Sequence, residues 1–463
     1  MAKYQKYAEY KDSGVEWLGD IPSHWEMWKL SHAYNEIGSG TTPSTSNEEN
    51  FEGDIPWVTT GELRENIILD TKKKVSQKTI ELFPTLRKYP SGSVAIAMYG
   101  ATIGRLGILG VEATTNQACC VMTTSKVLDN KYLFYWLQAF KNEIIQLSSG
   151  GGQPNINQEK VASLKISAPL VEDQVTIVNF LDHETAKIDS LISKQEKLIE
   201  LLKEKRQAVI SHAVTKGLDP NVPMKDSGVE WLGQVPEHWL KTKLVGVADG
   251  TKGCFVNGPF GSDLLANELQ DEGVPVVYIR DIKPTGYKRK STVHVTDKKA
   301  LQLEVCKLEA NDVIISKVGD PPGDACLYPE NEPSAIITQD VIRIRVNKIK
   351  FEPMYLVYLL NSDFGRTVMD NISVEGTRKR VSLGDFKATK FVLPTLEEQR
   401  VIITFLKNEC QKIDSIYKKA IHSISLSQER RTALISAAVT GKIDVRNWQN
   451  PNKNNEAKME FSA

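Results

Sequence analysis

The residues of this sequence that come closest to a catalytic motif are Asp320, Pro321, Pro322 and Gly323. Adenine methyltransferases use Asn or Asp followed by two prolines and an aromatic side chain that stacks on a flipped base. Here the fourth residue is glycine, which cannot stack, and no glycine-rich cofactor loop on a strand–helix unit precedes it. A methyltransferase site would need both features, so we interpret the motif as a tight turn.

Other kinds of catalytic or metal site are not indicated either. The chain has no GxxxxGK(S/T) loop for ATP phosphates, and its seven histidines show no metal-ligand spacing. His24 and His238 recur in matching Pro-x-His-Trp contexts, which favours shared packing or capping over chemistry. The six cysteines form no CxxC pair, which is typical of reduced thiols in a cytoplasmic protein. We therefore expect no catalytic residue, no metal ion and no cofactor in this chain.

The size and composition fit a globular protein of two or three domains. The 463 residues are 41% hydrophobic and 25% charged. Lys plus Arg and Asp plus Glu both number 58, which argues only weakly against nucleic-acid binding, because opposite charges can be sorted onto different elements. The N-terminus lacks the apolar core of a signal peptide. The least charged stretch, residues 93–113, contains glycines and Arg105, which favours buried strands over a membrane span.

The chain contains two internal repeats, each present twice. Residues 11–30 (KDSGVEWLGDIPSHWEMWKL) and 225–244 (KDSGVEWLGQVPEHWLKTKL) share fourteen of twenty positions. A second repeat begins as PLVEDQVTIVNFLDHETAKIDS at Pro169 and as PTLEEQRVIITFLKNECQKIDS at Pro394. It resumes as KEKRQAVISHAVTKGLD and as QERRTALISAAVTGKID. The sequence is therefore a tandem duplication.

Between the repeats lie two segments, roughly residues 24–168 and 238–393, whose sequences differ but whose landmarks recur in order. The matching landmarks are DIPWVTTGEL with GVPVVYIRDI, SVAIAMYGATIG with DVIISKVGDPPG, and TTNQACCVM with IITQDVIRI. Their β-branched runs, broken by Gly and Pro, predict short strands and loops. KYLFYWLQAF and MYLVYLLNSDF predict buried helices in equivalent places. Each segment is thus a mixed α/β domain of ordinary size, about 150 residues.

The repeats after Pro169 and Pro394 predict two long helices with a coiled-coil seam. They are charged, lack internal Gly and Pro, and carry apolar residues at a 3.5-residue period over about five heptads. At ~1.5 Å per residue, ~44 residues give a helix of ~65 Å. The apolar seam positions singled out are Ile188, Ile192, Ile199, Leu202, Ile413, Tyr417 and Ile424. The alternative is a pair of unrelated surface helices.

Two seam positions carry arginine, where a cation is costly unless it is paired. Arg206 and Arg431 are equivalent in the repeats, as are Asp189 and Asp414. If the helices pack antiparallel around a centre near residues 197 and 422, Arg206 lies level with Asp414, and Arg431 with Asp189. This predicts two reciprocal ion pairs. The alternative is that both arginines reach out of the seam to solvent or to a partner.

Together these features resemble the specificity subunits of type I restriction–modification enzymes. The resemblance covers nearly the whole chain. It rests on the tandem layout, on the Pro-x-x-Glu-Asp/Glu-Gln start of each long helix, and on the IDSL/IDSI and AVISHAVT/ALISAAVT stretches. It implies two target-recognition domains held apart by an antiparallel pair of long helices, each domain reading one half of a split double-stranded DNA sequence.

The resemblance also implies partners for a non-catalytic reader in a bacterial or archaeal cytoplasm. Two modification (methyltransferase) subunits, which carry S-adenosylmethionine, would dock on the helices. Restriction subunits would add translocase and nuclease activities that use ATP and Mg. Because the domains differ in sequence, we expect an asymmetric bipartite target with an unread spacer, its half-sites ~34 Å apart.

Two other interpretations of the sequence stay open. A recognition module of another methyltransferase-based defence system would differ only in its partners. A stand-alone coiled-coil scaffold would not need two divergent, loop-rich domains.

Candidate DNA contacts in the first domain lie in loops where glycine lets the backbone approach and where polar side chains can donate and accept. They are Thr41, Thr42, Thr59, Thr60, Tyr99, Thr102, Arg105, Gln117, Gln153 and Asn155. Ordinary turn chemistry is the alternative for each loop. The run Lys72-Lys73-Lys74 is interpreted as a solvated face.

The candidates in the second domain are Asn257, Ser262, Arg280, Lys317, Gln339, Arg378, Lys379 and Arg380. The last three are consecutive cations near a glycine and could form a phosphate clamp, or simply a solvated basic turn. Gln117 and Gln339 fall at matching positions after a strand. For these two glutamines a DNA or backbone contact and a buried hydrogen-bonding role are both open.

We predict an α+β fold: two mixed α/β target-recognition domains in tandem repeat, separated by two long antiparallel coiled-coil helices with pseudo-two-fold symmetry. The expected parts are an N-terminal repeat segment (1–23), recognition domain 1 (24–168), a central helical spacer (169–224), a second repeat segment with recognition domain 2 (225–393), a distal helix (394–446) and a disordered C-terminal tail (447–463).

Overall fold

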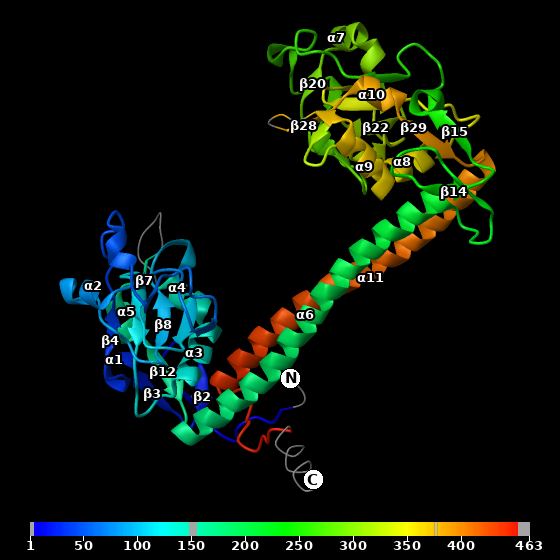
Figure 1. The fold of residues 1–463 in the computed structure, drawn as a ribbon. Helices are drawn as coiled ribbons and strands as arrows, with labels where there is room; N and C mark the ends of the chain where they lie inside the picture. Colours follow the sequence, from blue (N-terminus) through cyan, green and yellow to red (C-terminus); the bar gives the residue numbers. More distant parts are fainter. Residues whose placement is uncertain (1–3, 148–154, 375, 377, 452–463) are drawn as a thin grey trace. The chain divides into compact units, whose positions relative to one another are not determined.

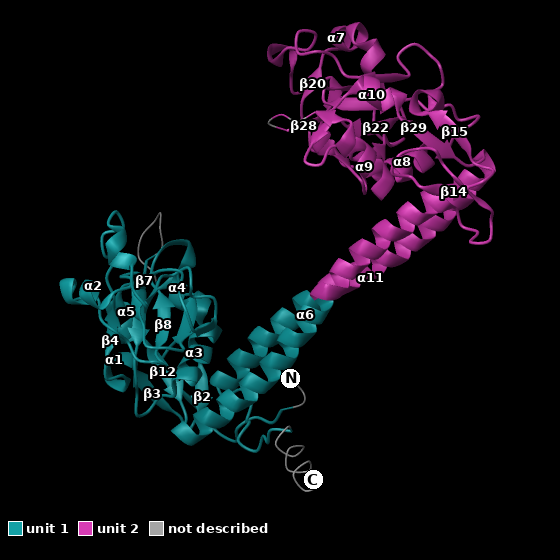
Figure 2. Cartoon of the chain, viewed as in Figure 1, with its two compact units in different colours: residues 1–195, 422–463 teal, residues 196–421 magenta. Residues whose placement is uncertain are grey.

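The structure is a computed structural model that describes residues 4–147, 155–374, 376 and 378–451. The chain divides into two compact units, which Figure 2 colours separately. Unit 1 comprises residues 1–195 and 422–463, and unit 2 comprises residues 196–421. The division falls inside both long helices, so each unit contains one recognition domain and one segment of each helix.

Unit 1 is built from short strands, short helices and parts of the two long helices (Figure 1). Its strands are β1 (Tyr10–Asp12), β2 (Asp20–Pro22), β3 (Glu26–Lys29), β4 (Ile37–Ser39), β5 (Ile55–Val58), β6 (Asn66–Ile68), β7 (Lys74–Val75), β8 (Val94–Ala97), β9 (Leu106–Leu109), β10 (Thr114–Thr115), β11 (Cys119–Met122) and β12 (Lys165–Ala168). Its short helices are α1 (Leu30–Ala33), α2 (Gln77–Leu82), α3 (Asn130–Ala139), α4 (Lys141–Gln146) and α5 (Gln158–Ser163). The long helices are α6 (Val171–Lys216) and α11 (Leu396–Val439).

A five-stranded sheet in the order β4-β11-β8-β9-β6 forms the centre of unit 1. All residues of β8, β9 and β11 are buried, which explains their continuous apolar sequences. A second sheet, β10-β5-β7, contains a parallel pair, β5 with β10. Strands β3 and β12 pair antiparallel, so the two ends of the recognition domain lie together.

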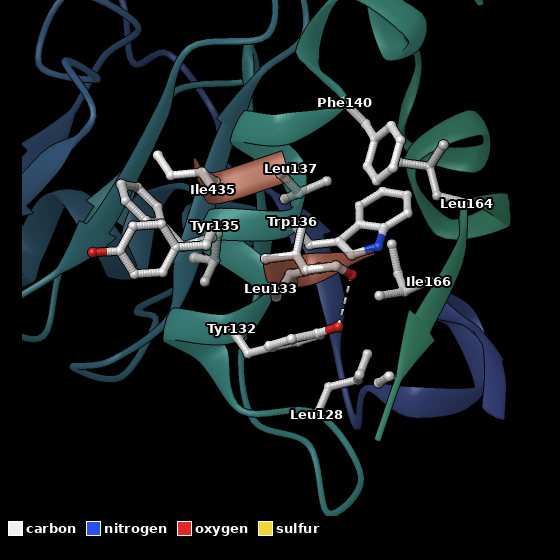
Figure 3. Packing of buried hydrophobic residues seen from close by; sticks show 14 of the residues in the cluster. Leu128, Tyr132, Leu133, Tyr135, Trp136, Leu137, Phe140, Leu164, Ile166 and Ile435 are labelled. Carbon is white, nitrogen blue, oxygen red and sulfur yellow. Dashed lines mark hydrogen bonds between the residues drawn. The ribbon is translucent and has the colours of Figure 1, made fainter. Parts of the chain in front are cut away.

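Helix α3 joins the recognition domain of unit 1 to the long helices. Figure 3 shows Trp136 of α3 and Phe140, directly after it, packed with Leu164 and Ile166, and Ile435 of α11 in the same cluster. The buried Tyr132 hydroxyl lies 3.1 Å from the carbonyl oxygen of Val439, to which it donates a hydrogen bond. Because Tyr132 and Trp136 are fully buried, this core fixes α3 against α11.

Unit 2 repeats this plan. Its strands are β13 (Met224–Asp226), β14 (Gln234–Pro236), β15 (Leu240–Lys243), β16 (Phe255–Asn257), β17 (Val274–Val277), β18 (Ile282–Lys283), β19 (Gly286–Tyr287), β20 (His294–Val295), β21 (Lys307–Leu308), β22 (Val313–Ser316), β23 (Val318–Gly319), β24 (Ala325–Leu327), β25 (Ala335–Ile337), β26 (Val341–Ile344), β27 (Ser373–Val374), β28 (Lys379–Val381) and β29 (Lys390–Leu393). Its short helices are α7 (Asp297–Gln302), α8 (Pro353–Asn361), α9 (Asp363–Asn371) and α10 (Leu383–Ala388).

The two main sheets of unit 2 share most of their strand order with those of unit 1, but the first lacks a counterpart of β6 and the second gains β21. One has the order β16-β26-β22-β24, and the other, β20-β17-β25-β21, contains the parallel pair β17 with β25. Strands β15 and β29 close the domain as β3 and β12 do in unit 1. The Tyr355 hydroxyl of α8 donates to the carbonyl of Val214 at 3.0 Å, as Tyr132 does to Val439.

Within each unit, segments of α6 and α11 lie side by side (Figure 2). In unit 1, Asp189 faces Arg431, while Leu181 shares a core with Ala438. Residue numbers therefore fall along α6 as they rise along α11, and the segments are antiparallel. The predicted seam positions are buried or half-buried along both helices, as the heptad pattern requires.

The predicted α+β class, the tandem pair of mixed α/β domains and the antiparallel long helices are confirmed. Each landmark pair also falls on equivalent elements, for example SVAIAMYGATIG on β8 and DVIISKVGDPPG on β22. Across the described residues, we find no helix with the length and hydropathy needed to cross a membrane.

Candidate nucleic-acid interface

The loops singled out in unit 1 meet at one end of its sheets. We call this set of residues, 40–43, 59–62, 98–105, 115–118 and 155–156, loop edge 1. Backbone hydrogen bonds connect its loops: Thr41 N–H to Thr115 O (3.0 Å), Asn116 N–H to Val58 O (2.9 Å), Met98 N–H to Ala118 O (2.8 Å) and Ile156 N–H to Met98 O (2.9 Å). Loops that are far apart in sequence thus form one surface.

The side chains of loop edge 1 are mostly polar and accessible. The Thr42 hydroxyl donates to the side-chain oxygen of Gln117, which is itself exposed. Tyr99, 39% exposed, forms a β-bridge with Asn155. Within the turn after β5, the backbone N–H of Thr59 donates to Glu62 Oε2 at 2.9 Å.

Three further candidates, Thr60, Thr102 and Arg105, are half-buried on the same loops. Gln153 lies outside the described residues. The surface therefore combines hydroxyl, amide and phenol groups, which can read base edges or bind phosphates.

Unit 2 has an equivalent surface, loop edge 2, made of residues 257–262, 278–281, 316–318, 338–340 and 378–381. Its connecting bonds are Thr338 N–H to Val277 O (3.1 Å), Lys317 N–H to Asp340 O (2.8 Å) and Val381 N–H to Lys317 O (2.9 Å). These match three bonds of loop edge 1 one for one. Gln117 therefore corresponds to Gln339, and Asn155 corresponds to Arg380.

A glycine sits at a close backbone approach in each loop edge. A Cβ added to Gly40 would lie 1.7 Å from the carbonyl oxygen of Thr115, and one added to Gly258 would lie 2.2 Å from that of Thr338. Neither position can hold a side chain without moving the backbone of the neighbouring turn. Glycine here is thus required by packing between loops, whether or not DNA approaches the same place.

The three consecutive cations of loop edge 2 do not share one environment. Lys379 pairs with Asp370, and Arg380 Nη2 lies 3.3 Å from Asp340 Oδ1. Arg378 is exposed. Burial lowers the pKa of the nearby Lys317 amine, and the positive Arg380 lowers it further, while Asp340 acts in the opposite direction. Two of the three cations thus already have a carboxylate partner that DNA phosphates would have to displace or share.

The remaining candidates of unit 2 lie in turns with local contacts. Arg280 Nε donates to Ser291 Oγ at 2.9 Å, and its guanidinium carbon lies 5.1 Å from the centre of the Tyr278 ring. The Asn257 amide donates to the carbonyl of Gly258 at 3.0 Å, and Ser262 is exposed in a turn. Arg280 is therefore held in place before any ligand binds.

The lysine run 72–74 of unit 1 resembles the solvated face that its sequence predicts. Lys73 Nζ lies 4.6 Å from the centre of the Phe51 ring, and Lys74 Nζ lies 3.0 Å from Asp70 Oδ1. Lys72 is exposed. Local contacts hold two of the three lysines, and Asp70 offsets the charge of one of them.

Sequence reasoning missed the segment that follows the turn after β5 in unit 1 and after β17 in unit 2. In unit 2 it is a hairpin with exposed Lys283, Lys288 and Lys290. In unit 1 it carries Ile67 and Leu69, which are 52% and 69% exposed. These two side chains line an open groove of about 630 Å³ together with the Thr59 turn. The run Lys288-Arg289-Lys290 is the signal that could have found the hairpin.

The motif Asp320-Pro321-Pro322-Gly323 forms a loop between β23 and β24. Gly323 has φ +97°, and a Cβ there would lie 2.5 Å from Met369 Cγ, so packing explains the glycine. In the described part of the chain no group of three His, Cys, Asp or Glu residues could hold a metal ion. Burial raises the pKa of the Cys120 and Cys326 thiols to about 12, which disfavours thiolate chemistry.

Both ion pairs expected in the helix seam are present. Arg431 Nε donates to Asp189 Oδ1 at 2.9 Å in unit 1, and Arg206 contacts Asp414 in unit 2. Each arginine side chain is 28% exposed, and the aspartates are 52% and 53% exposed. The pairs therefore sit at the rim of the seam, with the arginines further inside than the aspartates.

Comparison with known proteins gives a family match over most of the chain. The family described as "Type I restriction modification DNA specificity domain" matches residues 22–201 and 263–424. Each match contains most of one recognition domain and continues into a long helix. The two matches thus follow the internal duplication of the sequence.

Curated relatives match over much of the chain's length. The type I restriction enzyme MjaVIII specificity subunit of Methanocaldococcus jannaschii is 23% identical, over 92% of this chain and 95% of its own. The EcoBI specificity subunit of Escherichia coli is 24% identical, over 73% of this chain and 71% of its own. Both relatives are specificity subunits of type I restriction enzymes.

Solved structures share the fold. A chain described under "Structural basis underlying complex assembly and conformational transition of the type I R-M system" aligns with a TM-score of 0.67 and 16% identity, over 91% of this chain and 99% of its own. The HsdS subunit from Thermoanaerobacter tengcongensis aligns with a TM-score of 0.56 and 14% identity, over 91% of this chain and 98% of its own. At these identities the likeness establishes architecture only.

Proposed function

The chain belongs to the type I restriction–modification DNA specificity family, which is a non-catalytic DNA-recognition family, and we propose that its two recognition domains each read one half of an asymmetric, bipartite DNA target. The observation that carries the proposal is the pair of equivalent loop edges. Both use the same backbone hydrogen bonds, yet they present different side chains. A shared scaffold with different reading groups is what two unlike half-sites require.

The equivalent positions illustrate the difference in chemistry. Asn155, a neutral amide, is replaced by Arg380, and Gly61, which has no side chain, is replaced by Arg280. Asn favours adenine edges, whereas Arg favours guanine edges or phosphates. Gln117 and Gln339, exposed in both units, are the positions where the two readers could make similar contacts.

We further propose that the long helices dock two methyltransferase subunits and that restriction subunits join this core. One structural neighbour comes from work on complex assembly of a type I R-M system, which supports such partners here. S-adenosylmethionine would bind the methyltransferase subunit, and ATP and Mg the restriction subunit, with no cofactor in this chain. The purified chain alone should then transfer no methyl group and cut no DNA, and turnover of S-adenosylmethionine by it would contradict the proposal.

A domain exchange tests the reading of half-sites. Residues 24–168 are replaced by the equivalent region of a relative, and the protein is expressed with its methyltransferase subunit in a host without other methylation. Because β3 and β12 pair with each other, the exchange moves both partners together and leaves the sheet intact. Sequencing of the methylated sites should show one half-site changed and the other retained.

The reciprocal exchange is the matched control. Replacement of residues 238–393, which includes the equivalent pair β15 and β29, should change only the other half-site. If either exchange altered both half-sites, or neither, independent reading by the two domains would be rejected.

A further inference from the structure

The hairpin after β17 in unit 2 is strongly basic. Strands β18 and β19 pair Ile282 with Tyr287 and Lys283 with Gly286. Lys283, Lys288 and Lys290 are all exposed, and among the described residues none of the three forms an ion pair with a carboxylate. Arg289 lies 3.6 Å from Glu332 and is the one cation of this basic hairpin (residues 282–290) with a carboxylate partner in the described part of the chain.

A buried carboxylate holds the basic hairpin in one conformation. Asp281 is fully buried, and its side chain accepts hydrogen bonds from the backbone N–H groups of Tyr278 (2.8 Å), Lys290 (2.8 Å) and Ser291 (2.9 Å) and from the Ser291 hydroxyl (2.6 Å). The Tyr287 ring packs on Tyr328, with centroids 5.1 Å apart. The backbone on both sides of the hairpin is therefore fixed, so little backbone entropy is lost when its lysines bind an anion.

The basic hairpin starts from loop edge 2. Its anchor, Asp281, closes the turn 278–281, which corresponds to the Thr59–Glu62 turn of loop edge 1. Arg280 of that turn donates to Ser291, directly after the hairpin. Phosphates next to bases read by loop edge 2 would thus lie near the hairpin lysines.

Unit 1 is less basic at this place: its corresponding residues 63–71 contain one cation, Arg64, which is exposed and whose Nε donates to the carbonyl of Gly61 at 3.0 Å. The corresponding segment contains Ile67, Leu69 and Asp70, and Asp70 pairs with Lys74. The formal charge of the unit 2 hairpin is therefore not a property of the shared scaffold. It is an addition to one of the two domains.

We propose that Lys288 and Lys290, with Lys283 beside them, bind DNA phosphates adjacent to the half-site read by unit 2. This inference rests on the proposed DNA-recognition function. Each phosphate that a lysine neutralises releases condensed counterions, so these contacts add sequence-independent, salt-sensitive affinity. Unit 2 then carries more of the non-specific affinity than unit 1, and the basic hairpin contributes nothing to the choice of bases.

The test measures salt dependence in the full-length chain. The variant K288A/K290A is compared with wild type for binding to a duplex containing the methylated target and to a scrambled duplex, over a range of KCl concentrations. The slope of log affinity against log salt should fall by ~1.8, since each lost phosphate contact accounts for ~0.9. Affinity for both duplexes should fall by the same factor, which leaves the specificity ratio unchanged.

Two further variants test whether the change in salt slope comes from the charge of these lysines, and whether it depends on where the lysines lie. K288R/K290R keeps both charges and should keep the salt slope. K348A/K350A removes two exposed lysines that follow β26 at the end of the sheet away from loop edge 2, and should leave the slope unchanged.

An unchanged slope in K288A/K290A, or a changed specificity ratio, would overturn the role of the basic hairpin. So would an intact slope with loss of methyltransferase binding, which would assign the hairpin to a protein partner. If wild type itself showed no preference for the target duplex, the proposed function would fail instead.

Discussion

Units 1 and 2 hold their recognition domains on the long helices with the same contacts. In unit 1 the buried Tyr132 donates to the carbonyl of Val439 in α11, and in unit 2 the buried Tyr355 donates to the carbonyl of Val214 in α6. Gln174 and Gln399, both fully buried, accept a hydrogen bond from the backbone at the start of α3 and α8. The repeated Pro-x-x-Glu-Asp/Glu-Gln motif thus has a structural role: its last residue seats the recognition domain.

The contacts between recognition domain and long helices are alike in the two units, whereas the side chains of the two loop edges differ. Their backbone hydrogen bonds are equivalent, but the carboxylates that accept a hydrogen bond within the turn differ. After β5 in unit 1 this carboxylate is Glu62, and after β17 in unit 2 it is the buried Asp281. An apolar segment follows in unit 1, and the basic hairpin follows in unit 2. Backbone geometry therefore sets where a loop edge forms, while its side chains can change without disturbing the contacts between the recognition domain and the long helices.

The largest expected difference between the units is the loss of stability when the carboxylate of this turn is removed. Asp281→Ala removes four hydrogen bonds to a buried carboxylate and leaves backbone N–H groups without partners, which should cost about 3 kcal/mol. Glu62→Ala removes bonds to Thr59 only, at a half-buried site, and should cost about 1 kcal/mol. Urea unfolding measures the loss of stability in both variants, and hydrogen exchange at the Lys290 and Ser291 amides reports on Asp281→Ala. Equal losses of stability in the two variants would show that the two turns are closed equally strongly.

A second contrast lies at the start of the long helices. In unit 2 the buried Trp239 indole donates to Glu398 at 3.0 Å, and His238 Nε2 lies 2.9 Å from the same carboxylate. In unit 1 the indole nitrogen of Trp25 has no hydrogen-bond partner among the described residues. The equivalent acid there is Asp173, one methylene shorter than Glu398.

Glu398→Ala should therefore destabilise unit 2 by about 2 kcal/mol, because it leaves the Trp239 N–H buried and unsatisfied. Asp173→Ala should change stability by less than about 0.5 kcal/mol, since no bond to Trp25 is lost. Glu398→Gln keeps an acceptor and serves as the control. Thermal unfolding of the three variants decides the point, and a large loss in Asp173→Ala would show that the two motifs work alike.

In the two loop edges the comparison is between Arg380 and Asn155. Arg380→Ala removes a cation and should weaken DNA binding about tenfold and reduce the salt slope by ~1 if the arginine binds phosphate. Asn155→Ala removes no charge and should leave the slope unchanged. Binding titrations at several salt concentrations separate the two. A change in preferred base with the slope intact would make Arg380 a base reader.

Much of this architecture could be predicted because the sequence is duplicated, so that equivalent residues can be recognised by comparing the two copies. Heptad spacing placed the helices, and the equivalence of Arg206 with Arg431 and of Asp189 with Asp414 predicted their pairing. The match of Asn155 with Arg380 could not be seen, because the intervening loops differ in length and composition. The run Lys288-Arg289-Lys290 marks the basic hairpin in the sequence, but its place beside loop edge 2 depends on the buried Asp281, which the sequence shows only as one more acid beside Arg280.

The smallest expected effect concerns the two seam ion pairs, where the units should behave identically. Both arginines are 28% exposed and both aspartates about half exposed, so solvent screens each pair and its coupling should be ~0.5–1 kcal/mol. Double-mutant cycles with Arg431→Gln and Asp189→Asn, and with Arg206→Gln and Asp414→Asn, measure these couplings from urea unfolding. Both should shrink at 1 M NaCl, where the Debye length is ~3 Å. Unequal couplings would mean that one pair is linked to a neighbour that the other lacks. Tyr135 is the first residue to test, because its hydroxyl donates to Asp182 at 2.7 Å, whereas Tyr358 at the equivalent place makes no such hydrogen bond to a carboxylate among the described residues.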